Sequence, residues 1–456
     1  MYRVPDFLQQ GDWAIKIDLK QAYFHIPVAR SHQPFLRVLY KTDTTVASAP
    51  ATVELLQVTS LPFGLSSAPK AFATVSNWVA QLMRNQGLRV VVYLDDYLIV
   101  HQERQTLIEH VAEAVRILKI LGFTINFEKS ALIPSRIVEY LGITWNLATN
   151  SKYLPRDKRR RIVTKIQSIV ASYSWSLRDA QCVLGMLNFA SFVVHRGRLH
   201  CRPLQMACVH LPKNKPFTKH SFDQTVLVEL EWWIQALSAN RSTQIHPLPC
   251  THFLTTDASA TGWGAVLDDI RLSGIWHQNQ ISWHSNVKEM WAIIQAIQEL
   301  KHLLFNSTVL IQADNKSVVS YIRNQGGLRS RALFQITNML FHVMDEHNIE
   351  MITQYIPGQL NTEADLLSRQ KTQTEWYLTE EACREIFDRF GTPVIDLFAS
   401  RTAHILTRYV SRDCRDLNAE FHNAFSRRWH IAETQKCKHR CCVPHTHTHT
   451  RTHALY

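Results

Sequence analysis

Two adjacent aspartates interrupt an otherwise apolar run of the sequence. In VVVYLDDYLIV, residues 90–100, Asp95 and Asp96 lie between two β-branched and aromatic segments that are typical of strands. Taken alone, the dipeptide is best explained as an ordinary turn. A tight turn would let both carboxylates project from one edge, which Asp18, at the end of the strand-like segment WAIKID, could also reach. Three converging carboxylates repel one another unless cations lie between them, and two Mg²⁺ ions there would align an in-line phosphoryl transfer.

Four further carboxylates are spaced along the second half of the chain. Two of them end segments that we expect to be strands, Asp257 in HFLTTD and Asp314 in STVLIQAD. The other two lie near the start of expected helices, Glu289 in NVKEMWAIIQAI and Asp365 in NTEADLLSR. Singly, each has a plain structural explanation, because Asn286 with Glu289 and Thr362 with Asp365 both fit capping boxes. Strand ends and helix starts can nevertheless meet at one edge of a sheet. Together the four therefore predict an acidic cluster.

Five segments of the first third resemble, in order, the motifs of the reverse transcriptase palm. They are IDLKQAYFHI, LPFGLSSAPKAF, YLDD, GFTINFEKS and EYLGITW, between residues 17 and 145. The resemblance implies that Asp18 and Asp95 bind both catalytic metal ions and that Asp96 assists them.

The same resemblance implies roles for residues around these carboxylates. Tyr23 falls at the steric gate, where its ring would lie under the sugar and exclude a 2′-hydroxyl; a core aromatic residue is the alternative. Gly64 and Pro69 would shape the nucleotide floor, and Phe63 stands where many retroviral enzymes have Gln and retrotransposons usually have Phe. Lys129 matches a lysine proposed to protonate the leaving pyrophosphate, although a lone lysine is usually only solvated.

The second set of carboxylates resembles the active site of ribonuclease H. Its four motifs are TTDASATGWGAVL, NVKEMWAIIQAI, VLIQADNKSVV and YIPGQLNTEADLLSR, which contain Asp257, Glu289, Asp314 and Asp365. The resemblance implies two-metal hydrolysis of the RNA strand in an RNA–DNA hybrid. The loop IPGQLNTEAD lacks the histidine that some family members have there, as do many retrotransposon versions.

Positive charge is concentrated in one segment of the chain. The formal net charge is +12, and residues 151–219 contain 14 Lys or Arg against 2 Asp or Glu, so the remainder is about neutral. From charge alone, a nucleic-acid partner and a solvated surface are equally good explanations. By resemblance the segment is a helical thumb, whose phosphate contacts would be Arg156, Lys158, Arg159, Arg160, Arg161 and Lys165.

Hydrophobic periodicity and the resemblances together predict an α+β multidomain chain. It would contain a polymerase palm with an antiparallel sheet and helices, a helical thumb, and a ribonuclease H-like mixed α/β domain. We expect helices in APKAFATVSNWVAQLMRNQ and LIEHVAEAVRILKILG, and strands in HIPV and EYLGITWNL. Residues 41–60 depart from the short aromatic strand that the resemblance implies before LPFG.

The expected domain boundaries follow from these elements. The palm occupies 1–150, with the fingers largely missing because 17 residues precede Asp18, and the thumb, connection and linker occupy 151–250. The ribonuclease H-like domain occupies 251–370. A segment that follows ribonuclease H in retroelements occupies 371–430, and a low-complexity tail, HTHTHTHT, lies within 431–456.

Composition restricts the location of the chain. No apolar run approaches the roughly 20 residues of a membrane span, and the N-terminus has no secretory signal, so we expect an intracellular protein of the cytoplasm or nucleus. Nine cysteines without CxxC spacing suit a reducing compartment.

The order of the domains indicates a retroelement polyprotein. LPFGLSSAPKAF, LTTDASATGWGAVL and EWYLTEEACREIFDRFGTPVIDLFASR are most similar to the DIRS-type retrotransposons of animals, which use a tyrosine recombinase. The expected function is RNA-directed DNA polymerase with ribonuclease H, from an N-terminally incomplete copy in which ribonuclease H is the better preserved activity. It would use Mg²⁺ or Mn²⁺, two per active site, with deoxynucleoside triphosphates, an RNA template, a DNA primer and RNA–DNA hybrid. The alternative is a catalytically dead nucleic-acid-binding remnant; a cellular ribonuclease H would leave the palm motifs unexplained.

Overall fold

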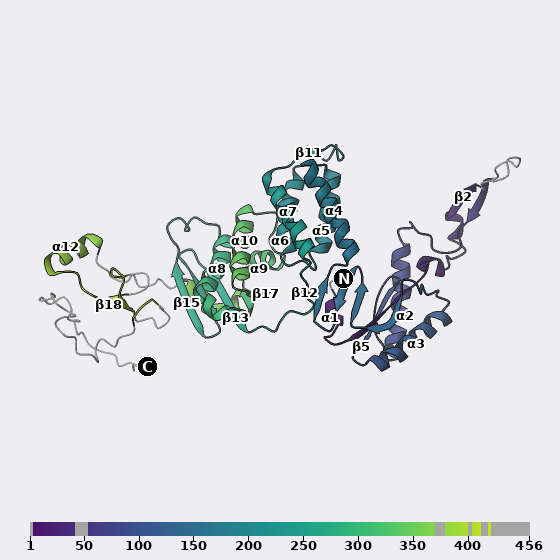
Figure 1. The fold of residues 1–456 in the computed structure, drawn as a ribbon, viewed down its shortest axis with the longest axis horizontal. Helices are drawn as coiled ribbons and strands as arrows, with labels where there is room; N and C mark the ends of the chain where they lie inside the picture. The colour runs from purple at the N-terminus through teal and green to yellow at the C-terminus, as the bar shows by residue number, and fades with distance from the viewer. Residues whose placement is uncertain (1–2, 42–52, 370–378, 400–403, 412–417, 421–456) are drawn as a thin grey trace.

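The computed structural model of the protein describes residues 3–41, 53–369, 379–399, 404–411 and 418–420. The chain builds successive units along the long axis of the molecule, from an N-terminal sheet through a helical unit to a second sheet (Figure 1). The expected combination of antiparallel and mixed sheets with helices is confirmed. Within the described ranges, no helix combines the length and hydropathy that a bilayer crossing requires.

The N-terminal sheet is antiparallel, with its strands in the order β4 (Arg89–Tyr93), β5 (Asp96–His101), β1 (Trp13–Asp18) and β6 (Ala131–Ser135). Helices α2 (Ala68–Asn85) and α3 (Arg104–Ile120), both expected from the sequence, pack on one face. Ile15 and Ile17 of β1 lie in the core beneath these helices. Because side chains alternate along a strand, Lys16 and Asp18 project from the opposite face, which the helices leave uncovered.

Two local expectations in this unit need correction. HIPV is not a strand: Ala22–His25 form a 3₁₀ helix, and Pro27 makes an isolated bridge to Ser60. EYLGITWNL is not one strand but two, β7 (Ile137–Tyr140) and β8 (Ile143–Asn146), joined by a turn at Leu141 and Gly142 with positive φ at both residues. Residues 53–57, where the sequence departs from the aromatic pattern, nevertheless form β3 (Val53–Gln57).

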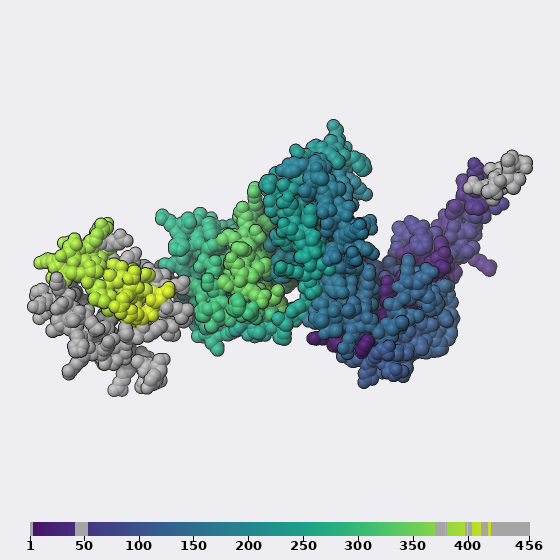
Figure 2. Space-filling model, in the orientation of Figure 1, coloured from purple at the N-terminus to yellow at the C-terminus, as the bar shows by residue number. Residues whose placement is uncertain are grey.

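Strand β3 pairs only with β2 (Arg37–Lys41) among the described strands, and every residue of the two strands is exposed. Figure 2 shows this hairpin projecting from the N-terminal unit. Its loop, residues 42–52, falls outside the described residues.

The helical unit follows the first sheet. A small sheet in the order β12 (Thr243–Gln244), β9 (Ser151–Tyr153), β8, β7 lies beside four helices, α4 (Arg156–Ser172), α5 (Leu177–Ala190), α6 (Gly197–Val209) and α7 (Gln224–Ala239). Trp145, Trp175 and Trp233 are fully buried in the shared core. The capping box of Ser176 and Asp179 at the start of α5 is present as expected. Strands β10 (Ser174–Trp175) and β11 (His220–Ser221) form a short separate ladder.

The second sheet has five strands in the order β15 (Ile270–Ile275), β14 (Gly262–Leu267), β13 (His252–Ala258), β16 (Thr308–Ala313) and β17 (Glu350–Tyr355). Strands β13, β16 and β17 are parallel, and β14 and β15 are antiparallel to their neighbours. Helices α8 (Ser285–Leu304), α9 (Lys316–Arg323) and α10 (Arg331–Glu346) contribute to the main core. This is the mixed α/β domain that the sequence predicts.

Helix α11 (Thr362–Arg369) lies directly against β14. A Cβ on Gly264 would come within 2.3 Å of the Ala364 carbonyl oxygen, so only glycine permits this approach. The remaining elements are α1 (Val4–Phe7), the 3₁₀ helices Gln33–Phe35 and Gly358–Leu360, α12 (Glu380–Phe390), β18 (Asp396–Ala399) and β19 (Tyr409–Ser411).

Candidate active sites

The two aspartates of YLDD lie at a tight hairpin, as expected. Tyr93 of β4 pairs with Asp96 of β5, so Leu94 and Asp95 form a two-residue loop. Asp18, the last residue of β1, pairs with Asp96 across the adjacent ladder. The ends of two neighbouring strands and their loop thus gather the three carboxylates at one edge of the sheet.

Three separate elements hold the backbone of this hairpin. Ser76 Oγ of α2 donates to the Leu94 carbonyl at 2.7 Å, and Leu19 N donates to the Asp95 carbonyl at 3.1 Å. The Tyr140 hydroxyl of β7 donates to the Asp96 carbonyl at 3.1 Å. Leu94 has φ +55°, a conformation that costs a non-glycine residue roughly 1–3 kcal/mol. The three hydrogen bonds offset that cost and fix the loop.

Two lysines compensate part of the negative charge. Burial raises the pKa of Asp95, and Asp18 raises it further, whereas Lys129 and Lys16 act in the opposite direction. Burial likewise raises the pKa of Asp96, and Lys16, whose Nζ lies 3.2 Å from Asp96 Oδ1, opposes that shift. Lys16 is a partner that the sequence analysis missed. Its position two residues before Asp18, on the same face of β1, was the available signal.

The residues expected around the nucleotide lie together. The Tyr23 ring centroid is 4.8 Å from that of Phe63 and 5.6 Å from that of buried Phe72. Tyr23 therefore bridges the core and the exposed Phe63. Gly64 has φ +92° with open space where a Cβ would stand, and Pro69 is the second residue of α2. Their roles toward a nucleotide stay predictions.

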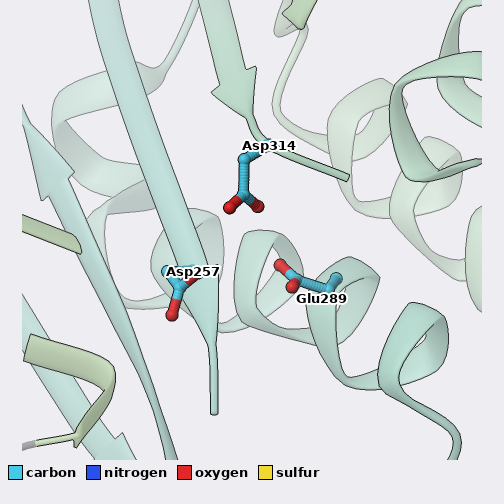
Figure 3. A group of neighbouring side chains, drawn as sticks. All are labelled: Asp257, Glu289 and Asp314. Atoms are coloured by element: carbon cyan, nitrogen blue, oxygen red, sulfur yellow. The ribbon is translucent and has the colours of Figure 1, made fainter. Parts of the chain in front are cut away.

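A tighter acidic group lies in the second sheet. Asp257 of β13, Glu289 of α8 and Asp314 after β16 each place one carboxylate oxygen within 4.8 Å of the others. Figure 3 shows the three side chains around a common space. Strands β13 and β16 are parallel neighbours, so their ends meet at this edge. Among the Asp, Glu, His and Cys side chains of the described residues, this is the one group of three with ligand atoms at that mutual spacing. The three palm carboxylates, Asp18, Asp95 and Asp96, lie farther apart from one another than this.

Glu289 is the most perturbed member of this group. Its side chain lies in the first turns of a helix and is 8% exposed, and its Oε2 is buried with no hydrogen-bond donor among the described residues. Burial, followed by the charges of Asp257 and Asp314, raises its pKa to about 9. A buried carboxylate oxygen without a donor beside two further carboxylates matches the oxygen ligands that a hard divalent cation requires.

Helix α11 orients the acidic group. Ser368 Oγ lies 2.5 Å from Asp257 Oδ2, and Ser368 is buried. Burial raises the pKa of Asp257, and the Ser368 hydrogen bond opposes that rise. Burial also raises the pKa of Asp314. Ser368 lies within the motif NTEADLLSR, and the motif alone predicts no role for it.

The fourth expected carboxylate, Asp365, does not join the group. Its Oδ1 accepts hydrogen bonds from Arg369 Nε at 2.8 Å and Nη2 at 2.6 Å. Its charge nevertheless raises the pKa of Asp257 and Asp314, so it lies close by. The capping-box alternatives are wrong for both helices, because α8 is capped by His284 and Thr362 is already the first residue of α11.

The basic residues of α4 divide into two kinds. Arg156, Arg160 and Arg161 are exposed, and Arg159 is partly exposed. Lys158 instead lies 3.4 Å from the Gly142 carbonyl and 4.2 Å from the Phe189 ring centroid, and Lys165 pairs with Asp179 at 2.8 Å. An open groove of about 620 Å³ between α4 and α5 is lined in part by Arg160, Arg161 and Lys165.

Comparison with known proteins identifies both domains. Residues 6–145 match the family model of the reverse transcriptase (RNA-dependent DNA polymerase), and residues 250–340 match that of the RNase H-like domain found in reverse transcriptase. The chain therefore contains a reverse transcriptase domain followed by an RNase H-like domain, as the sequence motifs predict.

Its relatives are retroelement polyproteins. The enzymatic polyprotein of Carnation etched ring virus is 25% identical over 320 residues, which cover 67% of this chain and 45% of the relative. That of Cauliflower mosaic virus (strain D/H) is 24% identical over 330 residues, covering 68% and 45%. The chain thus spans about half the length of these curated relatives. A solved structure of the foamy viral protease-reverse transcriptase in complex with double-stranded DNA is 16% identical, with a TM-score of 0.46 over 76% of this chain and 57% of that one.

Proposed function

We propose that this chain is the polymerase and ribonuclease H part of a retroelement polyprotein, of the DIRS type that its sequence motifs favour. In this proposal residues 1–150 are the palm, 151–250 the thumb and connection, and 251–370 the ribonuclease H domain. Residues 371–430 would correspond to the segment that follows the ribonuclease H domain in such elements. The low-complexity tail, residues 431–456, lies outside the described residues. The two matched domains and the polyprotein relatives support the assignment.

The proposed chemistry is phosphoryl transfer at both sites. Asp18 and Asp95, assisted by Asp96, would hold Mg²⁺ or Mn²⁺ while a DNA primer is extended on an RNA template with deoxynucleoside triphosphates. For cleavage of the RNA strand in the hybrid, the metal ions would be held by Asp257, Glu289, Asp314 and Asp365. Two metal ions, when bound, neutralise charge at the phosphate and activate the attacking oxygen. The protein's part is to hold the carboxylates at ligand spacing and to orient them.

The strongest support for the proposal is the close spacing of the carboxylates of Asp257, Glu289 and Asp314. The buried Oε2 of Glu289, which has no hydrogen-bond donor among the described residues, adds to it. The test uses the full chain, because α6 of the helical unit contributes Leu199 to the core of this domain. Purified protein with Mg²⁺ or Mn²⁺ should cleave the RNA strand of a labelled RNA–DNA hybrid. Cleavage no greater than that of an Asp314→Asn variant would contradict the proposal.

One observation favours a second candidate for the polymerase half, namely nucleic-acid binding without catalysis. Lys16 pairs with Asp96, and the three palm carboxylates are not at mutual ligand spacing. Primer extension by the full chain separates the two functions. Incorporation that Asp95→Asn abolishes supports the polymerase, whereas salt-sensitive hybrid binding without incorporation supports the binding remnant.

A further inference from the structure

The three carboxylates of the acidic group come from two kinds of element. Asp257 lies at the end of β13 and Asp314 directly follows β16, whereas Glu289 extends from helix α8 (Figure 3). Pairing of β13 with β16 fixes the first two beside each other, but α8 only packs on the sheet. Repulsion acts on its position, because the charge of Asp314 contributes to the raised pKa of Glu289. Further contacts must therefore hold Glu289 near the strand ends.

An amide pair joins α8 to the end of β16. Asn315 Nδ2 donates to Asn286 Oδ1 at 2.9 Å. Asn286 lies one helical turn before Glu289, on the same face of α8, and Asn315 directly follows Asp314. Both amides are half-buried. This amide bridge, Asn286 with Asn315, thus connects the same two segments that carry the carboxylates of Glu289 and Asp314.

Asn315 is itself held by the helix that it caps. Its Oδ1 accepts hydrogen bonds from two backbone N–H groups in the first turn of α9, at 3.0 and 3.1 Å. With the oxygen directed at α9, the amide nitrogen is directed at α8. Serine or aspartate would cap α9 about equally well, but neither has an N–H group to donate to Asn286. The contact with α8, and not the cap, is what requires an amide here.

A second contact holds the same turn of α8 on the side of Asp257. Lys288 Nζ donates to the Ala260 carbonyl at 3.1 Å, in the loop after β13, and Lys288 is 6% exposed. Glu289 is therefore carried by a helical turn that is tied to the loops after both strands. Because removal of a buried lysine also disturbs packing, the neutral amide bridge is the contact that substitution can test cleanly.

We propose that Asn286 and Asn315 are positioning residues, which hold Glu289 and Asp314 at the spacing that lets them share a divalent cation; the cation as ligand rests on the proposed function. The carboxylate oxygens of the group lie within 4.8 Å of one another. Without the amide bridge, repulsion between the two carboxylates would move α8 away from the end of β16. The site would keep its ligands and lose their preorganised spacing. Its affinity for metal would then fall while the fold is kept.

The experiment measures Mn²⁺ binding to the full chain by calorimetric titration, without nucleic acid. The part of the signal that Asp314→Asn abolishes belongs to this site. Asn315→Ser keeps a cap on α9 and removes the amide donor, and Asn286→Ala removes the acceptor. Each should weaken Mn²⁺ binding about 10-fold, the lower end for residues that orient metal ligands, because they act through the segments and not on the carboxylates. Asp223→Ser, a cap exchange on α7 of the helical unit, is the matched control and should leave the affinity unchanged.

The double variant separates positioning from a general loss of structure. If the amide bridge acts as one unit, Asn286→Ala combined with Asn315→Ser should bind Mn²⁺ no more weakly than either single variant. Losses that multiply in the double variant, or unchanged affinity in both single variants, would overturn the proposal, as would a wild type that binds no Mn²⁺ at this site. A wild type that binds Mn²⁺ and cleaves no hybrid would contradict the proposed function alone, and a non-additive result would still establish the bridge.

Discussion

The single residue that best reveals the nature of the second acidic site is Glu289. Its pKa of about 9 in the folded chain lies above the ordinary value of 4.5, because it is buried beside Asp257 and Asp314. A carboxyl whose folded pKa is raised favours the folded state fully below pH 4.5. That contribution is lost as the pH rises from 4.5 to about 9. Without metal, therefore, the charged form of Glu289 destabilises the chain at neutral and alkaline pH.

Glu289→Gln should consequently stabilise the metal-free protein at pH 8. We expect a higher unfolding temperature at pH 8, by about 1 °C for each 1 kcal/mol in a chain of this size, and no increase at pH 4.5. Added Mg²⁺ or Mn²⁺ should stabilise the wild type and not the variant. Calorimetry at the two pH values, with and without metal, measures both effects. A variant that is less stable than the wild type at pH 8 would show that the buried charge of Glu289 does not destabilise the folded chain.

Ser368 is a positioning residue for the same site, since its hydroxyl donates to Asp257 and it supplies no carboxylate of its own. Ser368→Ala should raise the metal concentration needed for half-maximal hybrid cleavage by about 10–100-fold and leave the maximal rate less affected. Ser317→Ala, at an exposed serine of α9, is the control. Equal metal dependence of Ser368→Ala and wild type would exclude the positioning role.

At the scale of elements, the YLDD hairpin depends on contacts from far along the chain. The Tyr140 hydroxyl reaches the Asp96 carbonyl from β7, and Tyr140 is 1% exposed. Tyr140→Phe removes one donor and should destabilise the protein by about 1 kcal/mol. If the chain extends primers, we expect that rate to fall several-fold while hybrid cleavage is unchanged. Tyr173→Phe, on the helical unit, should alter neither rate, and parallel losses of both activities in Tyr140→Phe would indicate general misfolding instead.

The same hairpin shows which features the sequence could predict. Apolar strands on either side of Asp95 and Asp96, and the helical periodicity of α2 and α3, are local patterns, and the structure contains those elements. Side-chain partners were not predictable in this way. Lys16 with Asp96, Asp365 with Arg369, and Lys158 beneath Phe189 depend on which surfaces pack together. The strand predictions for HIPV and EYLGITWNL were wrong because short apolar runs do not distinguish a strand from a turn between strands.

At the scale of the whole molecule, the helical unit and the RNase H-like domain are joined by a specific junction. Arg196, at the start of α6, donates to Asp345 of α10 from Nη2 at 2.6 Å and Nε at 2.9 Å, and its guanidinium lies 4.4 Å from the Phe341 ring centroid. Gln325 Oε1 accepts hydrogen bonds from the backbone of Arg198 at 3.1 Å and of Leu199 at 3.3 Å. These contacts cap α6 from the other domain, so the two units should move and unfold together.

Asp345→Asn tests that coupling. Burial alone would raise the pKa of Asp345, but hydrogen bonds from His195 and Arg196 lower it to about 2, so the carboxylate is charged throughout the neutral range. The substitution leaves the Arg196 guanidinium, whose side chain is 8% exposed, without a counter-ion; because the Asp345 side chain is 41% exposed and water screens the pair, we expect a cost of about 1–2 kcal/mol. We expect calorimetry to resolve two transitions in place of one, and hybrid cleavage products of less uniform length because the site is no longer held at a fixed distance from the helical unit. The neighbouring Glu346→Gln, which removes an exposed pair with His342, should keep a single transition. One cooperative transition in both variants would mean that the remaining contacts at α6 suffice to join the two domains.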